Sequence, residues 1–316
     1  MKLSIIGAGQ IGGVIAFLAS IYGNFDEVFL YDVADGLAEG KSLDINHGLN
    51  IIGSSVKIAG SSNINQIAGS DIIIITAGVA RKPGMSRDDL LFTNADIVIS
   101  VASNIKKLAR DSIVIVVTNP LDAMTWLVYK TTGFTSEKVV GMAGILDSSR
   151  YCFHLAEALS LKDCPSSAKD IHALVLGGHG DDMVPVRDSA RLFGTSVTNF
   201  LDTERMSAIE NRVRQSGAEI VGLLKTGSAF FSPAVGAYTM AKAIIRDENR
   251  FLAASCLLNG EYGIKDIYFG VPCILGREGV KKVVEVEISP DESDLLKQSA
   301  SRVRGLVDQL RAKYGL

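Results

Sequence analysis

The feature that most constrains this fold lies at the amino terminus, where a glycine-rich turn separates two apolar segments. Lys2 to Ile6 has the composition of a buried strand, and Val14 to Ile21 has the pattern of a helix. Between them stands Gly7-Ala-Gly-Gln-Ile-Gly12. Gly7 permits a tight turn, Gly9 lets the backbone approach a pyrophosphate, and Gly12 allows close helix packing. We therefore expect a strand, turn and helix that hold the phosphates of a dinucleotide at the helix N-terminus.

A carboxylate follows the next expected strand, at the distance that a dinucleotide site requires. Val28 to Tyr31 is apolar and ends in Asp32, twenty residues past Gly12. Asp32 would bind the adenosine ribose hydroxyls and repel a 2′-phosphate, which favours NAD over NADP. The alternative is a secretory signal peptide. We reject it because four glycines interrupt the apolar region and cleavage near Ala19 would remove the turn.

Composition indicates an ordinary globular protein. The chain has 316 residues and 47% hydrophobic content, enough for two domains. Its formal charge of −3 argues against nucleic acid or anionic membrane as a partner, and no apolar run approaches the roughly 18 residues that span a bilayer. The cysteines show no metal-ligand spacing, so we expect free thiols in a reducing cytoplasm and no metal. They are Cys152, Cys164, Cys256 and Cys273.

Short β-branched segments alternate with helical ones through the first half, which predicts a parallel sheet covered on both faces. After the two strands already described, the expected strands are Val56 to Ala59, Asp71 to Thr76, Ser112 to Thr118 and Lys138 to Met142. The fold class is therefore α/β. We expect a doubly wound Rossmann domain for NAD over residues 1–145 and an α+β substrate-binding catalytic domain over 146–316.

The second half mixes helical and strand patterns. We expect helices at Asp147 to Ser160, Thr203 to Lys225 and Val235 to Arg246, and strands at Ala173 to Leu176, Phe251 to Leu257, Asp266 to Leu275 and Val280 to Ile288. A last helix should begin after Ser289 as N-cap, with Pro290 at its first position and Glu292 completing a capping box.

Ligands of open α/β sheets bind beyond the carboxyl ends of the strands, which draws attention to the loop after Asp71 to Thr76. This loop contains glycine and proline breaks, and Ser86 with Asp89 forms a capping box that should start a long helix. Arg81 and Arg87 would then sit on a mobile lid over the nicotinamide, each able to hold a carboxylate or polarise a carbonyl. The structural alternative is that both arginines are merely solvated.

A candidate acid–base pair appears around residues 147 and 179. Asp147 and Arg150 lie three apart and so share a helix face, where the simpler interpretation is an exposed ion pair worth about 0.3–0.5 kcal/mol. His179 stands among glycines at the end of a strand, and its imidazole suits transfer of a hydroxyl proton in either direction. Asp147 is the candidate to fix its tautomer. We interpret the other histidines, His47, His154 and His172, as structural.

Over essentially its full length the chain resembles the lactate/malate dehydrogenase family, and within it the lactate-dehydrogenase-like malate dehydrogenases. The motifs that carry the resemblance are Gly7-Ala-Gly-Gln-Ile-Gly12, Thr76-Ala-Gly-Val-Ala-Arg-Lys-Pro-Gly-Met-Ser-Arg87, Val117-Thr-Asn-Pro-Leu-Asp122, Leu146-Asp-Ser-Ser-Arg150 and Gly177-Gly-His-Gly-Asp181. Lys225 to Pro233 fits the subgroup, but its alignment with lactate enzymes needs a small insertion. The resemblance places Thr226 or Ser228 near the substrate methylene.

The resemblance implies a role for each site residue. His179 would be the proton acceptor, oriented by Asp147, while Arg150 grips the C1 carboxylate, Arg87 polarises the C2 oxygen and Asn119 binds near the substrate hydroxyl. The family motifs place the cofactor on Gly7, Gly9, Gln10, Ile11, Gly12, Asp32, Thr76, Ala77, Gly78, Asn94, Val117 and Asn119. They also imply a cytoplasmic homo-oligomer, a tetramer rather than a dimer, that acts on malate in the citric acid cycle.

Arg81 indicates the substrate, because malate enzymes of the family carry arginine here and lactate enzymes typically carry glutamine. Pyruvate would leave the Arg81 charge enclosed and unpaired, at about 2–5 kcal/mol, or roughly thirty- to several-thousand-fold. The alternative inside the family is an L-lactate or other 2-hydroxy-acid dehydrogenase that tolerates Arg81.

Two further alternatives come from other classes. Tyr238 and Lys242 match the tyrosine and lysine spacing of short-chain dehydrogenases, although the glycine spacing of those enzymes differs from Gly7 to Gly12. A non-catalytic NAD-binding protein would be expected to lack His179, Asp147 or Arg150, and none is missing. We interpret the tyrosine and lysine as a chance match on a helix.

Overall fold

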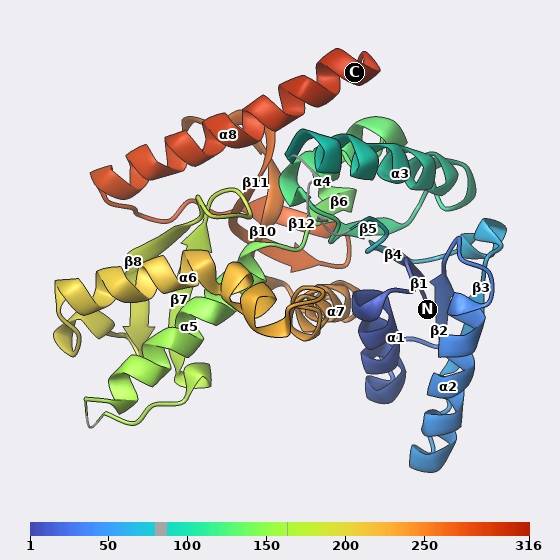
Figure 1. Cartoon of the computed structure of the whole chain (residues 1–316), viewed down its shortest axis with the longest axis horizontal. Coiled ribbons are helices and arrows are strands. Elements are labelled where there is room, and N and C mark those ends of the chain that lie inside the picture. Colours follow the sequence, from blue (N-terminus) through green and yellow to red (C-terminus); the bar gives the residue numbers. More distant parts are fainter. Residues whose placement is uncertain (80–86, 163) are drawn as a thin grey trace.

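The computed structural model describes residues 1–79, 87–162 and 164–316, and in its first half strands alternate with helices (Figure 1). Six strands of this half lie parallel in the order β3-β2-β1-β4-β5-β6, which is the doubly wound Rossmann arrangement and confirms the predicted fold class. The elements are β1 (Lys2–Ile6), α1 (Gln10–Tyr22), β2 (Glu27–Tyr31), α2 (Leu37–Ile52), β3 (Lys57–Ser61), β4 (Ile72–Ile75), α3 (Arg87–Leu108), β5 (Ile113–Val116), α4 (Leu121–Thr132) and β6 (Val139–Gly141).

The second half adds to this sheet and also builds a separate one. Strand β10 pairs antiparallel with β6 through Ser255 and Gly141, so that β10, β11 and β12 extend the first sheet across the predicted domain boundary. The second sheet contains β7, β8 and β9. The elements are α5 (Gly144–Ser160), β7 (Ile171–Leu176), β8 (Val184–Leu192), β9 (Thr195–Ser196), α6 (Thr203–Leu224), α7 (Phe231–Ile245), β10 (Arg250–Asn259), β11 (Lys265–Gly276), β12 (Gly279–Val283) and α8 (Pro290–Tyr314).

The strands at the centre of the first sheet are buried on both faces. All four residues of β4 and all four of β5 are isoleucine or valine with little or no solvent exposure. Helices cover them, with α1 packed against α7 and α4 packed against α3 and β11. Figure 1 shows α1 and α2 at one end of the molecule, α5 and α6 toward the other, and α8 along the upper edge. Among the described helices, none is both long enough and apolar enough to cross a membrane.

Two strand expectations differ from the structure. The strand expected over Val280 to Ile288 ends at Val283, because the Val286 N–H bonds the Tyr262 hydroxyl and Glu285 accepts from the Tyr262 N–H instead of continuing the ladder. Strand β8 was not expected at all, since Pro185 and a run of polar residues interrupt its alternation. The capping box of α8 is confirmed: the Ser289 hydroxyl and the Glu292 carboxylate each accept from the other's backbone N–H.

Candidate functional site

The glycine-rich turn lies where the strand order reverses, between the carboxyl ends of β1 and β4. Gly7 has a positive φ of 110° and donates its N–H to the Tyr31 carbonyl oxygen at 2.8 Å. A Cβ on Gly12 would lie 1.9 Å from the Gly7 carbonyl oxygen, whereas a Cβ on Gly9 would meet nothing within 4 Å. The turn is therefore closed against the sheet at Gly12 and open at Gly9, and this open side fits a pyrophosphate.

Asp32 follows β2 and holds this turn in place. One carboxylate oxygen accepts the Ala8 N–H at 2.7 Å, and the other accepts the Ala34 N–H at 2.9 Å. A carboxylate offers about four acceptor positions, so two remain for ribose hydroxyls. Asp32 thus holds the glycine turn and keeps acceptor positions that suit the hydroxyls of an adenosine ribose.

The loops that follow β4 and β5 are tied to one another and to the turn. The Thr76 hydroxyl donates to the Gly7 carbonyl oxygen at 3.0 Å, and the Thr118 hydroxyl donates to the Ala77 carbonyl oxygen at 2.7 Å. Asn94, which is buried on α3, accepts from the Val79 N–H at 2.8 Å and donates to the Asn119 carbonyl oxygen at 2.7 Å. These contacts bring the remaining predicted cofactor positions to one edge of the sheet, namely Gln10, Ile11, Gly78 and Val117.

The predicted acid–base pair is brought together from two elements. Asp147 lies in the first turn of α5 and is 2% exposed. One of its carboxylate oxygens lies 2.8 Å from His179 Nδ1, and the other accepts from Arg150 Nη1 at 3.2 Å. The Arg150 Nε is buried without a hydrogen-bond partner, which leaves a guanidinium edge ready for an anion.

The surroundings of His179 favour its protonated form. Burial of the ring opposes a charge, but the Asp147 carboxylate, its hydrogen bond and a second carboxylate at Asp122 outweigh this, so that the pKa of His179 is raised. Because Nδ1 faces Asp147, the Nε2 atom is the one left to exchange a proton with a ligand. The site can therefore give or take a proton near neutral pH.

The backbone of the loop that carries His179 is fixed by three contacts that the sequence did not indicate. Gly177 and Gly270 exchange two main-chain hydrogen bonds, and the Gly178 N–H donates to the Ser299 hydroxyl at 2.9 Å. The His179 N–H donates to Asp122 at 2.8 Å. Asp122 stands inside the motif Val117 to Asp122, so its place in that motif was the available signal.

The remaining predicted residues either fall outside the described part of the chain or have partners away from this site. Arg81 lies outside the described residues, as does Ser86 of the expected capping box. Arg87 is the first residue of α3, and its side chain is outside the described part. Tyr238 accepts a hydrogen bond from Asn24, and Lys242 lies 3.6 Å from Glu248, which accounts for both residues of the chance match without a catalytic role.

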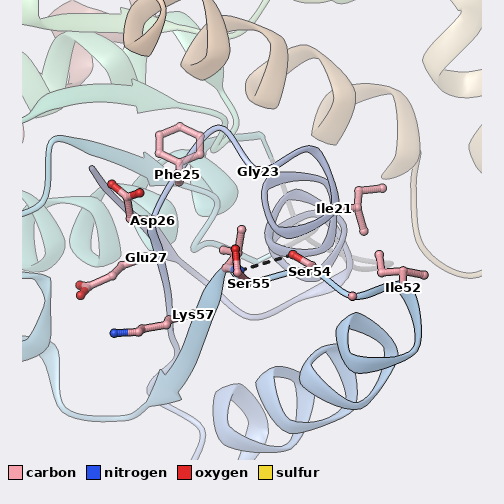
Figure 2. Close-up of a pocket in the computed structure, with 11 residues that line it drawn as sticks. Ile21, Gly23, Phe25, Asp26, Glu27, Ile52, Ser54, Ser55 and Lys57 are labelled. Atoms are coloured by element: carbon pink, nitrogen blue, oxygen red, sulfur yellow. Dashed lines mark hydrogen bonds between the residues drawn. The ribbon is translucent and has the colours of Figure 1, made fainter.

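A cavity of about 560 Å³ occurs at the opposite edge of the sheet (Figure 2). Asp26, Glu27 and Lys57 line it where β2 and β3 begin, together with Ser54 and Ser55. Ligands in open α/β sheets bind at the carboxyl ends of the strands, so this cavity is separate from the site of His179. The described residues include no cluster of three or more histidine, cysteine, aspartate or glutamate side chains suited to a metal.

Comparison with known proteins gives one consistent result. The model of the lactate/malate dehydrogenase NAD binding domain matches residues 1–141, and that of the family's alpha/beta C-terminal domain matches residues 145–313. A malate dehydrogenase of Geotalea uraniireducens (strain Rf4) is 46% identical over 320 residues, covering 98% of this chain and 99% of the relative.

Two solved structures from Cryptosporidium parvum are similar to the whole chain. Its malate dehydrogenase superposes with a TM-score of 0.94 at 41% identity, over 98% of this chain and 99% of that one. Its lactate dehydrogenase, complexed with lactic acid and nicotinamide adenine dinucleotide, superposes with a TM-score of 0.93 at 39% identity, over 98% and 97%.

Proposed function

The chain belongs to the lactate/malate dehydrogenase family, and from this we propose that it is an NAD-dependent malate dehydrogenase, which reversibly oxidises (S)-malate to oxaloacetate. The observation that carries the proposal is the constellation of His179, Asp147 and Arg150, joined at 2.8 and 3.2 Å. It supplies a base, a carboxylate that orients the base, and a cation for a substrate carboxylate. The relatives named malate dehydrogenase support malate as the substrate.

Each residue of the constellation has a defined task in this reaction. Bound NAD would supply the acceptor, nicotinamide C4, for the hydride that leaves C2 of malate. His179 takes the hydroxyl proton on Nε2, while Asp147 holds Nδ1 and stabilises the imidazolium. Arg150 offers the C1 carboxylate its unpartnered Nε together with an Nη, the paired geometry that guanidinium and carboxylate favour.

Further positions complete the proposed site. Arg81 pairs with the second carboxylate of the substrate, Arg87 polarises the C2 oxygen, and Asn119 binds near the hydroxyl. The open glycine turn and the helix N-terminus at Gln10 and Ile11 receive the pyrophosphate.

Substrate choice tests this proposal. Purified wild type and Arg81→Gln are offered oxaloacetate or pyruvate, and NADH oxidation is followed. We expect wild type to prefer oxaloacetate, and the ratio of kcat/KM values for the two substrates to fall about thirtyfold or more in the variant, because the charge that pairs with the second carboxylate is lost. Lys82→Gln removes a neighbouring charge and serves as the matched control.

A lactate dehydrogenase remains the second candidate, because a lactate enzyme of Cryptosporidium parvum is nearly as similar in structure as the malate enzyme. Equal or faster turnover of pyruvate by the wild type would establish that alternative and leave the role of His179 intact. An unchanged substrate ratio in Arg81→Gln would remove Arg81 as the selector.

Cofactor choice gives a second prediction. Asp32→Ala should weaken NADH binding, because the glycine turn loses its contact at Ala8 and the ribose loses its acceptor. NADPH should gain relative to NADH by about tenfold, since a carboxylate no longer faces the 2′-phosphate. Titration of both cofactors measures the ratio, with Asp35→Ala as the control that removes an exposed charge nearby. A ratio that stays at the wild-type value would show that another residue sets the preference.

The same reasoning extends to assembly and location. We propose a cytoplasmic homo-oligomer, a tetramer or a dimer, that serves the citric acid cycle and binds neither nucleic acid nor membrane. Exposed apolar side chains on three helices support an interface between copies. They are Leu43, Ile51 and Ile52 on α2, Val221 and Leu223 on α6, and Phe231 and Val235 on α7. The division into an NAD-binding unit over 1–145 and a substrate-binding unit over 146–316 likewise remains a prediction.

A further inference from the structure

Asp122 is a buried carboxylate directly behind the histidine of the proposed site. It lies in the first turn of α4 and is 5% exposed. One carboxylate oxygen accepts the His179 N–H at 2.8 Å, and the other accepts the Ser255 hydroxyl of β10 at 2.6 Å. A Cβ on Gly178 would lie 3.6 Å from the same oxygen that binds His179. The carboxylate therefore links α4, β10 and the loop that carries His179.

The negative charge of Asp122 is not required for these hydrogen bonds. The side-chain oxygen of an asparagine would also accept the His179 N–H, and its Nδ2 would donate to the Ser255 hydroxyl oxygen in place of accepting from it. An asparagine would also avoid the cost of burying an ion. Among the described residues, no lysine or arginine forms an ion pair with Asp122, whereas Asp147 repels it and His179 attracts it. The cation that attracts the Asp122 carboxylate is thus the protonated imidazole of His179.

We propose that Asp122 is a positioning residue for the dehydrogenase reaction, which fixes the main chain of His179 and places a second negative charge behind its imidazole. The inference rests on the proposed function. Asp147 orients the ring through Nδ1, and Asp122 acts through the backbone N–H of His179 and through its charge. The Asp147 carboxylate, which contacts the ring, and the Asp122 carboxylate, which accepts the backbone N–H of His179, then stabilise the imidazolium together.

Protonation of the two groups is compatible with this role. Burial raises the pKa of Asp122 to about 6, although its hydrogen bonds with Ser255 and the His179 N–H act in the other direction. The pKa of His179 is raised above its ordinary value of 6.5 and so lies above that of Asp122. His179 therefore titrates beside an ionised Asp122.

In the part of the chain that the structure describes, few charges act on Asp122, namely those of His179 and Asp147. Strands β5 and β6 carry no ionisable side chain, and β10 contributes the Ser255 hydroxyl. From α5 come Asp147, which raises the pKa of Asp122, and Arg150, which lowers the pKa of His179. The contacts of α4 with α8 and β11 include Arg311 over the ring of Trp126 and the packing of Tyr129 on Tyr268, both later along the helix.

The pKa of His179 tests the proposal directly. The chain has four histidines, so the NMR titration of labelled imidazole carbons, with His179→Asn to assign the signal, follows this group without substrate. In Asp122→Asn we expect the pKa of His179 to fall by about 0.5–1 unit, which is a three- to tenfold change in proton affinity. The acid limb of kcat/KM for malate oxidation should move to lower pH by the same amount, because the reaction requires neutral His179.

Two more variants separate the effect of the Asp122 charge from the anchoring of the loop that carries His179. Ser255→Ala removes a hydrogen bond that keeps Asp122 ionised, so a smaller shift in the same direction is expected even if Asp122→Asn fails to fold. Ser299→Ala frees the neighbouring Gly178 N–H and removes a hydrogen bond to Asp182, but it changes no charge, so turnover should fall while the pKa of His179 stays in place. If neither Asp122→Asn nor Ser255→Ala moves that pKa, Asp122 is a structural anchor alone and the proposal is wrong. If the pKa of His179 shifts in the variants but the wild type does not turn over malate, the proposed function is wrong while the contact between Asp122 and His179 stands.

Discussion

Replacement of His179 by asparagine is expected to lower kcat for both directions of the malate–oxaloacetate reaction by about 10⁴-fold. Asparagine is of similar size and can keep a hydrogen bond to Asp147, but it cannot take or give a proton near neutral pH. The hydride transfer would then proceed with no base for the hydroxyl proton. Stopped-flow single turnovers with NADH measure the loss at the chemical step.

Binding of NADH should change by no more than about twofold in this variant, because the glycine turn and Asp32 follow β1 and β2, whereas His179 lies in the loop after β7. His172→Asn, an exposed histidine on β7, is the matched control and should retain wild-type turnover. A His179→Asn enzyme within tenfold of the wild-type kcat would remove His179 as the base.

The parts of this site that follow local patterns could be predicted from the sequence. The glycine turn, Asp32 and the first six strands depend on residue types at fixed local spacing, and the structure has them in the expected succession along the chain. The alternating strands and helices indicated the doubly wound sheet for the same reason, since each strand of this kind must be buried on both faces.

Contacts between distant segments could not be predicted in this way. The link from Asp122 to His179 spans 57 positions, and the link from Gly178 to Ser299 spans 121. Neither leaves a periodic signal, because the folding of α4 and α8 against β11 brings these residues together. Strand β8 was missed for a related reason: its pairing with β7 tolerates Pro185, which opposes a strand when only the local sequence is considered.

Asp147→Asn is expected to reduce kcat/KM for oxaloacetate at neutral pH by about 10³-fold, since the same change in the acid of a serine–histidine–aspartate site costs roughly 10⁴-fold. One substitution removes two contacts of this carboxylate: the charge that faces His179 Nδ1 at 2.8 Å and the acceptor for Arg150 at 3.2 Å. The first loss leaves the imidazole tautomer unfixed, and the second frees the guanidinium that should hold the substrate. KM and kcat should therefore both deteriorate.

The pH dependence distinguishes this change from a general loss of structure. Among the influences that raise the pKa of His179, the charge of Asp147 is the largest, so the variant should titrate at lower pH. Reduction of oxaloacetate requires the imidazolium, and its alkaline limb should move to lower pH. Malate oxidation requires the neutral ring, and its acid limb should move the same way. Asp188→Asn, which removes an exposed charge from β8, should leave both limbs in place.

The raised pKa of His179 also makes the free energy of unfolding depend on pH. A folded-state pKa above the unfolded value means that the charged pair stabilises the fold at pH below the ordinary histidine range, and that this contribution is lost as pH rises through the raised pKa. Urea unfolding of the wild type should therefore show a decrease in the free energy of unfolding across that interval, and Asp147→Asn should show a smaller one. Equal slopes in the two proteins, together with unmoved pH limbs, would mean that Asp147 does not control the protonation of His179.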